Sequence, residues 1–243
     1  MKFPILKELL SRLGFLVPPR LVHYVSGLLN YLAVGRWFHD RQLAIPVRCA
    51  GREALYDHLA KSVVEPASYL EFGVFKGVTL RHWSNLLKHP ETRFDGFDSF
   101  IGLPETWGYF CDKKLFDVQG QMPKYDDARV HLHKGWFTDT LPGFLTQFQP
   151  RPTLILHLDA DLYSSTIFVL RQMRPWLRVG NILIFDEFFD REHEMKALTE
   201  FMQDEGMSIK CLATTRALSQ TAFQITALPP LPTVPPQAQG HPS

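Results

Sequence analysis

The feature that most constrains the fold is an alternation of short apolar runs with helix-like segments beyond residue 66. Helical periodicity occupies residues 79–87, 141–148 and 165–177. The apolar runs that these segments separate each have the length of a buried strand: SYLEFGV, RFDGFDSF, VHLHKG, TLILHLDAD and NILIFDEF. Strands that alternate with helices pair in parallel and are covered on both faces of the sheet. The sequence therefore predicts an α/β fold on a mostly parallel sheet.

Both ends of this alternation predict further elements. Helices are expected at residues 52–64 and 194–205, and the pieces MSIKCLATTR and TAFQITA near the end predict a hairpin with one antiparallel strand. Residues 3–40 predict two amphipathic helices that break at Pro18 and Pro19. These helices either cap the core or a second subunit, or lie on a membrane surface, and we favour the cap.

A tail rich in proline follows the predicted domain, and six of the eighteen prolines fall in it. Such a composition predicts an extended or disordered segment. The predicted divisions are a helical extension at residues 1–40, one domain at 41–227 and the tail at 228–243.

Composition excludes several classes of protein. The formal net charge is +1, with 26 basic against 25 acidic residues and no basic block, so a dedicated nucleic-acid binder is not expected. Cys49, Cys111 and Cys211 are too widely spaced for a disulfide framework or a thiolate zinc site. No apolar run reaches the roughly 20 residues of a transmembrane helix, and charges interrupt the region where a signal peptide would be apolar. We expect a cytoplasmic protein.

Acidic residues and glycines end the first two predicted strands, where ligands bind in open α/β sheets. Glu71 is followed by Gly73 and Gly77 in a turn that lets a ligand approach the backbone, while Glu71 offers an acceptor to a cationic group. The alternative is an ordinary turn with Glu71 in a surface ion pair. Asp98 could accept both hydroxyls of a ribose, or could cap a turn with Ser99. Because Glu71 ends the preceding strand, we favour the contact of Asp98 with ribose hydroxyls over the capping role.

Four more carboxylates follow the last two of these five predicted strands. They are Asp159 and Asp161 in the run HLDADLYSST, and Asp186 and Glu187 in the run IFDEF. Unless compensated, such charges at one rim would repel one another and raise their own pKa values. A hard divalent cation such as Mg²⁺ would resolve this with oxygen ligands. The alternative is that these side chains cap the helices that follow. We expect capping by Asp161 or by a residue of 164–166, and we expect Asp159 and Asp186 to bind a metal.

A long connection at residues 99–129 lacks a continuous helical period and is rich in aromatic residues. Connections of this length in a compact domain are typically lids, binding loops or disordered segments, and the aromatic residues favour a lid over disorder. We expect a lid over the site.

The motifs YLEFGVFKGVTL, GFDSFIGLPE, KGWFTDTLP, LHLDADLYSST and IFDEF, in this order, resemble the macrocin O-methyltransferase (TylF-type) family over about residues 52–226. The resemblance implies an S-adenosylmethionine-dependent enzyme with a seven-stranded methyltransferase sheet. The residues that it implies for the cofactor are Glu71, Gly73 and Gly77 around the methionine part, Asp98 with Ser99 at the ribose, and Gly135 with Trp136 and Phe137 near the adenine. Trp136 and Phe137 could instead be core residues.

The resemblance also implies that Asp159, Asp186 and Glu187 bind Mg²⁺, although the family commonly has aspartate where this chain has Glu187. It implies methylation of a hydroxyl, which we expect on a sugar of a glycosylated natural product or glycan. The candidate bases for the hydroxyl proton are Asp159 first, then Asp161, His157 and His193. The stretch DREHEMKAL departs from the family pattern, so the acceptor could differ.

Other readings of the sequence concern the acceptor and the assembly. The acceptor could be phenolic or lipid-linked, with the first helix at a membrane surface. The chain could also be a non-catalytic protein with this fold, whose helical extension and tail mediate assembly. A homo-oligomer is compatible with each reading.

Overall fold

The computed structural model describes residues 3–107 and 112–231. It confirms the predicted alternation of strands and helices. The helices are α1 (Pro4–Gly14), α2 (Pro19–Asp40), α3 (Arg52–Ala60), α4 (Val78–Leu86), α5 (Phe137–Leu145), α6 (Tyr163–Met173) and α7 (Glu194–Glu205), with a short 3-10 helix at Arg174–Trp176. The strands are β1 (Arg48–Cys49), β2 (Ala67–Phe72), β3 (Arg93–Asp98), β4 (Val130–Lys134), β5 (Thr153–Leu158), β6 (Ile182–Phe185), β7 (Ser208–Thr215) and β8 (Thr221–Ala227).

Across the described residues, these strands form one eight-stranded sheet in the order β1-β7-β8-β6-β5-β2-β3-β4. All neighbouring pairs are parallel except those of β8, which runs antiparallel to both β6 and β7. The predicted fold class and the terminal hairpin are therefore confirmed. The sequence did not predict β1, because two residues are too few to form an apolar run.

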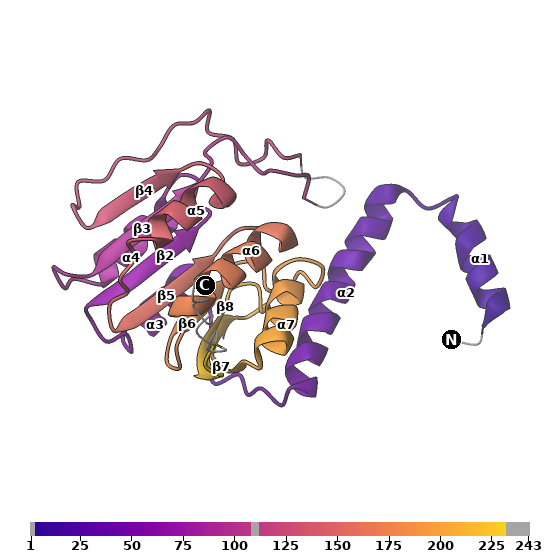
Figure 1. The fold of residues 1–243 in the computed structure, drawn as a ribbon. Helices are drawn as coiled ribbons and strands as arrows, with labels where there is room; N and C mark the ends of the chain where they lie inside the picture. The colour runs from indigo at the N-terminus through magenta and orange to yellow at the C-terminus, as the bar shows by residue number, and fades with distance from the viewer. Residues whose placement is uncertain (1–2, 108–111, 232–243) are drawn as a thin grey trace, which may run out of the picture.

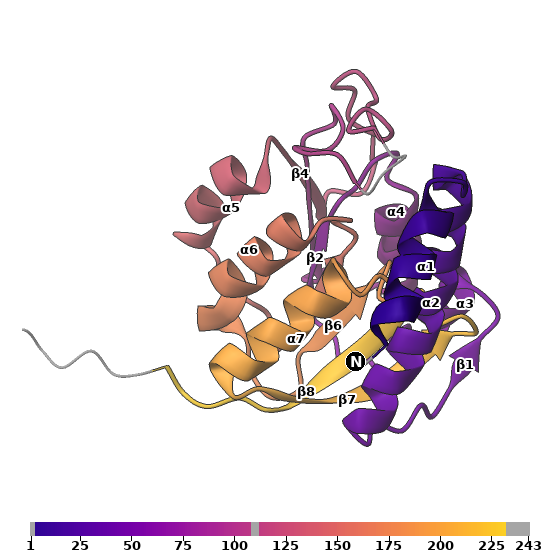
Figure 2. The same cartoon turned by 90° about the vertical axis from the view of Figure 1, so that its right-hand side faces the viewer.

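Helices cover both faces of the sheet, as the edge-on view in Figure 2 shows, with α5, α6 and α7 on one side and α3 and α4 on the other. Every residue of the central strand β2 is buried, which is why its sequence reads as an unbroken run. Trp83 of α4 packs under one face, and Phe188, after β6, packs under the other. Full burial of such a side chain stabilises the fold by roughly 1.5–3 kcal/mol.

The two N-terminal helices break at Pro18 and Pro19, as predicted. The last part of α2 is fixed on the domain, because Val34, Trp37 and Phe38 are buried there and the Trp37 indole donates to Thr199 Oγ1 at 2.8 Å. The first part of α2 and all of α1 project from the domain (Figure 1).

Two further predictions concern the ends of the chain and the membrane. Within residues 3–107 and 112–231, no helix combines the length and the apolar character needed to cross a bilayer. Most of the predicted proline-rich tail, residues 232–243, lies outside the described residues.

Candidate active site

A cavity of about 660 Å³ opens at the carboxyl ends of β2, β3, β5 and β6. This is the edge at which ligands bind in open α/β sheets, and the volume suits a cofactor-sized molecule. The predicted site residues that line the cavity are Gly73, Asp98, Ser99, Trp136, Asp159, Asp161, Asp186 and Glu187.

Gly73 brings the turn after β2 against the end of β5. Its φ is +100°, a region that side chains rarely adopt, and a Cβ placed on it would lie 1.8 Å from the carbonyl oxygen of Asp159. The backbone N–H of Asp159 in turn donates to the carbonyl of Phe72 at 2.9 Å. Glycine is therefore required for the cavity floor to join these two strand ends.

Asp98 is held at the cavity floor by three backbone N–H groups. Val74 and Phe75 donate to its Oδ2 at 2.8 and 2.7 Å, and Phe100 donates to its Oδ1 at 2.6 Å. A carboxylate has about four acceptor positions, so capacity remains for a ligand hydroxyl. The predicted turn-capping role and the predicted ribose contact are thus compatible in one side chain.

Ser99 and Trp136 line the same cavity as Asp98. Ser99 Oγ donates to the carbonyl of Gly102 at 2.8 Å, which fixes the start of the long connection after β3. Trp136 precedes α5 and is partly exposed, and Phe137 beside it also lines the cavity. Phe137 packs edge-on to Phe72 at 5.5 Å, so it contributes to the core as well as to the wall.

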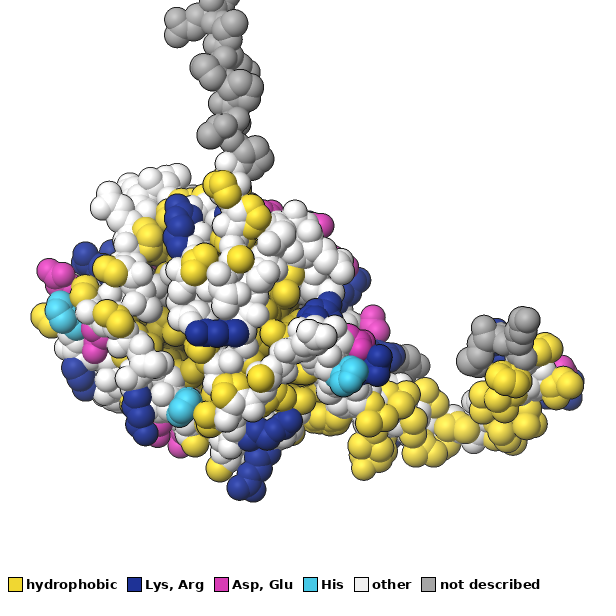
Figure 3. Space-filling view, turned by 90° about the horizontal axis from the view of Figure 1, so that it is seen from below, with side chains coloured by type: hydrophobic (Ala, Val, Ile, Leu, Met, Phe, Trp, Pro, Cys, Tyr) yellow, Lys and Arg dark blue, Asp and Glu magenta, His cyan; other side chains and the backbone are white. Residues whose placement is uncertain are grey.

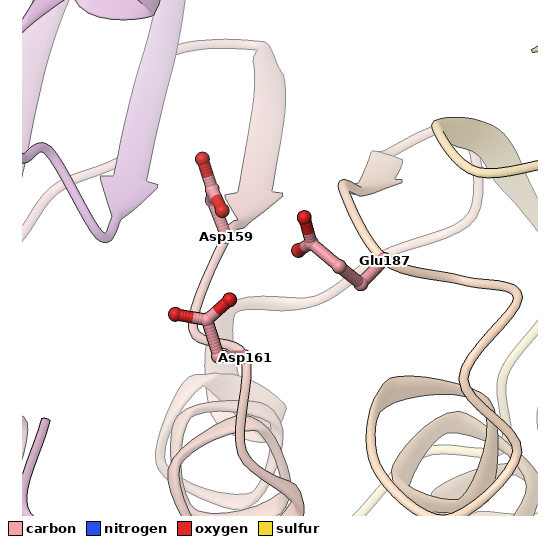
Figure 4. A group of neighbouring side chains, drawn as sticks. All are labelled: Asp159, Asp161 and Glu187. Atoms are coloured by element: carbon pink, nitrogen blue, oxygen red, sulfur yellow. The ribbon is translucent and has the colours of Figure 1, made fainter. Parts of the chain in front are cut away.

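Three carboxylates converge beside this pocket, as Figure 4 shows for Asp159, Asp161 and Glu187. One oxygen from each lies within 4.8 Å of the others. Asp159 and Asp161 follow β5, and Glu187 follows β6, so the parallel strands bring the groups together. Asp161 has a φ of +57°, and this left-handed turn aims its carboxylate back toward Asp159.

Burial and mutual repulsion dominate the electrostatics of the cluster, although Arg52 lines the same cavity. Burial, with the charges of neighbouring carboxylates, raises the pKa of Asp159 and of Glu187 well above their ordinary values. Burial and the charge of Asp186 raise the pKa of Asp161 to about 7. Glu187 Oε2 is buried and has no hydrogen-bond partner among the described residues. Hard oxygen donors with a free, buried lone pair fit a divalent cation such as Mg²⁺.

Asp186 lines the cavity but is not one of the three converging groups, unlike the set that the resemblance implies. Its Oδ2 accepts from Arg52 Nη2 at 3.0 Å and from Gln220 Nε2 at 3.3 Å, and Tyr56 donates to its Oδ1 at 3.2 Å. Burial would raise the pKa of Asp186, but the contacts with His157 and Arg52 lower it below its usual value. In the structure, Asp161 takes the place expected for Asp186.

Glu71 lies beneath the cavity and does not line it, in contrast to its predicted contact with the cofactor. Its side chain is fully buried and accepts from the Tyr69 hydroxyl at 2.7 Å. Burial raises the pKa of Glu71 to about 8. The Tyr69 hydroxyl also lies 2.6 Å from Nδ1 of His157, which is buried as well. His157 is thus a core residue within this buried chain of hydrogen bonds, rather than a base at the cavity wall.

Three other predicted residues also lie away from the cavity wall. Gly77 faces the long connection, because Tyr125 donates to its carbonyl at 2.9 Å. Gly135, with a φ of +144°, forms the turn before Trp136. His193 precedes α7, and its Nδ1 accepts from the backbone N–H of Tyr163 at 3.1 Å. A ring nitrogen occupied in this way supports the start of α6 instead of facing the carboxylates.

The predicted side-chain cap of α6 was wrong. Neither Asp161 nor a residue of 164–166 makes a capping hydrogen bond at its start. Ser164 instead donates to Glu105 of the long connection at 2.5 Å. Within that connection, Leu103 and Phe116 line the cavity, in agreement with the expected lid, and residues 108–111 lie outside the described residues.

Sequence reasoning missed Arg52 and Glu194. Arg52 opens α3 and lines the cavity with a half-exposed side chain. Glu194 is fully buried in the first turn of α7, and its Oε2 accepts from the backbone N–H of Glu187 at 3.0 Å. Its other oxygen has no hydrogen-bond partner among the residues that the structure covers. An acidic residue at a helix start is ordinary in sequence, so nothing distinguished Glu194.

Comparison with known proteins identifies the family. The model of the macrocin O-methyltransferase (TylF) family matches residues 52–213. Demethyldecarbamoylnovobiocin O-methyltransferase of Streptomyces niveus is 30% identical over 158 residues, which are 56% of this chain and 58% of that protein. A tetracenomycin 4'-O-methyltransferase of Streptomyces olivaceus, which is named for a dimethoxyrhamnosyl substrate, is 30% identical over 143 residues, or 51% and 53%. The chain thus spans little more than half the length of these relatives.

Solved structures share the fold. The O-methyltransferase NovP superposes with a TM-score of 0.56 at 24% identity, over 72% of this chain and 80% of that one. The calicheamicin methyltransferase CalS11 superposes with a TM-score of 0.51 at 21% identity, over 92% of this chain and 87% of that one. A CmcI structure named with Mg-SAM gives 0.50 at 18% identity, over 73% of each chain. Because the family model matches most of this chain, residues 52–213, the chain belongs to the macrocin O-methyltransferase (TylF) family of methyltransferases.

Proposed function

We propose that the chain transfers a methyl group from S-adenosylmethionine to a sugar hydroxyl of a glycosylated small molecule, with Mg²⁺ in the cavity. One observation carries the proposal: the turn at Gly73 and the carboxylate of Asp98 share a cavity with the converging carboxylates of Asp159, Asp161 and Glu187. A cofactor site and a cation site that share one cavity are what metal-assisted methyl transfer requires.

The cofactor would lie between the turn after β2 and the wall at Trp136. Asp98, fixed by three backbone N–H groups, would accept from the ribose hydroxyls, and Ser99 holds the adjoining loop in place. Gly73 would allow the methionine part to pass close to the backbone. Trp136 and Phe137 offer an apolar surface for the adenine.

Asp159, Asp161 and Glu187 would hold the cation. Asp159 and Glu187 belong both to the set that the resemblance implies and to the set that converges, and Asp161 is the third by its geometry. Asp186, which Arg52 and Tyr56 hold in place, would add its negative charge to the surroundings of the cation.

When bound, the cofactor supplies an electrophilic methyl group and the cation acidifies an acceptor hydroxyl. Asp159 would receive the hydroxyl proton, because it lies where the turn at Gly73 meets the carboxylate group. Residues of the long connection, among them Phe116, would exclude water from the reacting atoms.

The aromatic side chains of the cavity wall bear on the acceptor. Phe75, Phe116 and Phe168 line the cavity together with Arg52. Aromatic walls suit a flat apolar group, while adjacent hydroxyls of a sugar suit the carboxylates. A sugar carried by an aromatic aglycone meets both requirements. The names of the two Streptomyces relatives, which refer to novobiocin and tetracenomycin compounds, support this class of acceptor.

The test is methyl transfer to a panel of aryl glycosides with S-adenosylmethionine and Mg²⁺, followed by mass spectrometry. We expect the mass gain of one methyl group on the sugar, and its loss in chelator or in Asp159→Asn. Transfer that survives both treatments would refute the role of the cation. Transfer only to phenols without a sugar would refute the acceptor.

A further inference from the structure

The N-terminal arm, defined here as residues 3–32, is the most apolar exposed surface of the described chain. No residue of α1 is buried. Sixteen large apolar side chains of the arm are exposed, against seven in all the rest of the described chain. Seen from below in Figure 3, apolar side chains cover most of the arm where it leaves the domain.

The exposed face of α2 has the spacing of a helix-packing seam. Leu21, Val25, Leu28 and Leu32 follow one another at intervals of four, three and four residues, and their exposed fractions are 51, 47, 51 and 71%. This 4-3-4 pattern places them in one stripe, as in a coiled coil. The opposite side of α2 is used by the domain, because Trp37 and its neighbours are buried there. The stripe therefore points away from its own domain.

Helix α1 carries a second apolar stripe. Ile5, Leu9 and Leu13 repeat every four residues and are exposed, while Glu8 and Arg12 form an ion pair at 2.6 Å on another side of the helix. An amphipathic helix gains its stability chiefly from packing its apolar stripe, so α1 also needs a partner surface.

The apolar area is that of a stable protein interface. With each of the sixteen side chains roughly half exposed, the arm presents on the order of 1,500 Å². The largest apolar patch on a typical monomer is about 300–600 Å², and a standard interface buries about 800 Å² per partner. That area is summed over all sides of the arm, and a partner that covers about half of it would bury as much as a standard interface does.

The charge pattern of the α2 stripe favours a protein partner over a lipid surface, although α1 carries Lys7 and Arg12 against Glu8 alone. Helices that lie on membranes carry Lys and Arg along the border of the apolar face. Arg20 and Arg36 lie at the two ends of the α2 stripe, and the sequence has no Lys or Arg along its length, from residue 21 to residue 35. The same uncharged run, residues 21–35, is shorter than the roughly 20 residues that span a bilayer.

We propose that the arm docks on the arm of a second copy of this chain. A seam that repeats along one helix is complementary to itself, which is what a two-fold symmetric interface requires. In the dimer, the stripe at Leu21, Val25, Leu28 and Leu32 packs against its symmetry mate, and the stripe of α1 covers the flank of the resulting helix pair. Because the last part of α2 is anchored on the domain, the arms join two complete domains.

Analytical ultracentrifugation of the full chain over the micromolar range tests this. We expect a dimer for the wild type and a monomer for Leu28→Glu/Leu32→Glu. Val179→Glu is the matched control, because Val179 is a similarly exposed apolar residue, 61% accessible, far from the arm in sequence. It should remain dimeric. Circular dichroism and binding of S-adenosylhomocysteine verify that the variants are folded.

Each other outcome overturns the proposal. A wild type that stays monomeric across this range would mean that the arm closes on its own chain or is covered by something else. A dimer that persists in Leu28→Glu/Leu32→Glu would place the interface elsewhere. A monomer that co-sediments through the arm with vesicles of phosphatidylcholine and phosphatidylglycerol would assign the surface to lipid.

Discussion

Arg52 Nη2 lies 3.0 Å from Oδ2 of Asp186, and this pair governs which carboxylates converge in the cavity. Tyr56 and Gln220 add two more hydrogen bonds to the same carboxylate, so Asp186 is satisfied without a cation. Asp161 has no such set of partners, and its oxygen joins those of Asp159 and Glu187. The carboxylates after β5 and β6 thus divide into a satisfied group and a group that needs a cation.

This division predicts different effects of two similar substitutions. Asp161→Asn should weaken Mg²⁺ affinity about tenfold or more, because it removes a converging oxygen charge. Asp186→Asn should have a smaller effect on affinity, but should lower the free energy of unfolding by about 1–3 kcal/mol, since Arg52 loses its charged partner. Calorimetric titration with Mg²⁺ and urea denaturation measure the two effects. The reverse order of affinities would return Asp186 to the ligand set.

Glu194 is expected to position Glu187 through the hydrogen bond from its backbone N–H. Glu194→Ala removes the acceptor and should weaken Mg²⁺ affinity by about tenfold, as loss of an outer hydrogen bond does at other metal sites. Glu194→Gln keeps an acceptor oxygen and should recover most of that affinity. The same titration compares both variants. Equal losses would mean that Glu194 acts only through its charge.

Glu71 predicts a pH dependence of stability. Its pKa is about 8 in the folded state against 4.5 as the ordinary value, so the folded protein binds the proton more tightly. The free energy of unfolding should therefore fall as pH rises from about 4.5 through 8, by up to a few kcal/mol from this group. The raised pKa values of Asp159, Asp161 and Glu187 act in the same direction, and the lowered pKa of Asp186 acts against it. Comparison with Glu71→Gln isolates Glu71.

The measurement is urea denaturation of wild type and Glu71→Gln at pH 5 and pH 8. The gap between the two proteins should shift in favour of Glu71→Gln at the higher pH, because glutamine does not ionise. Parallel pH profiles would show that Glu71 does not change its ionisation on folding.

Gly73 should not tolerate a side chain. In Gly73→Ala the new Cβ would meet the carbonyl of Asp159 at a φ of +100°, and we expect the free energy of unfolding to fall by at least about 2 kcal/mol. Gly143→Ala, in α5, is the matched control, since nothing lies within 4 Å of its Cβ position. It should be neutral or stabilising by up to about 1 kcal/mol. Similar losses in both variants would contradict the close approach.

The centre of the sheet was predictable because β2, β3, β5 and β6 are buried almost throughout and read as apolar runs. The run at β2 and the hairpin of β7 and β8 follow from such patterns alone. The sequence also predicts that Asp98 and Asp159 lie at one edge of the sheet, because the carboxyl ends of parallel strands lie at the same edge.

The orientation of individual side chains was not predictable in the same way. Asp186 and Glu187 are adjacent in sequence, yet one contacts Arg52 and the other faces Asp161. Glu71 lies beneath the cavity floor, where it accepts a hydrogen bond from the Tyr69 hydroxyl. Sequence patterns do not show where that hydroxyl lies. These contacts depend on tertiary neighbours far apart in the chain, and no local periodicity encodes them.

The most direct test of the cation site is titration of Mn²⁺ into the metal-free protein with S-adenosylhomocysteine present, followed by electron paramagnetic resonance. The wild type should bind one ion, and Mg²⁺ should displace it. Asp159→Asn/Glu187→Gln should bind none while still binding S-adenosylhomocysteine. An unchanged Mn²⁺ site in that double variant, or no site in the wild type, would contradict the account.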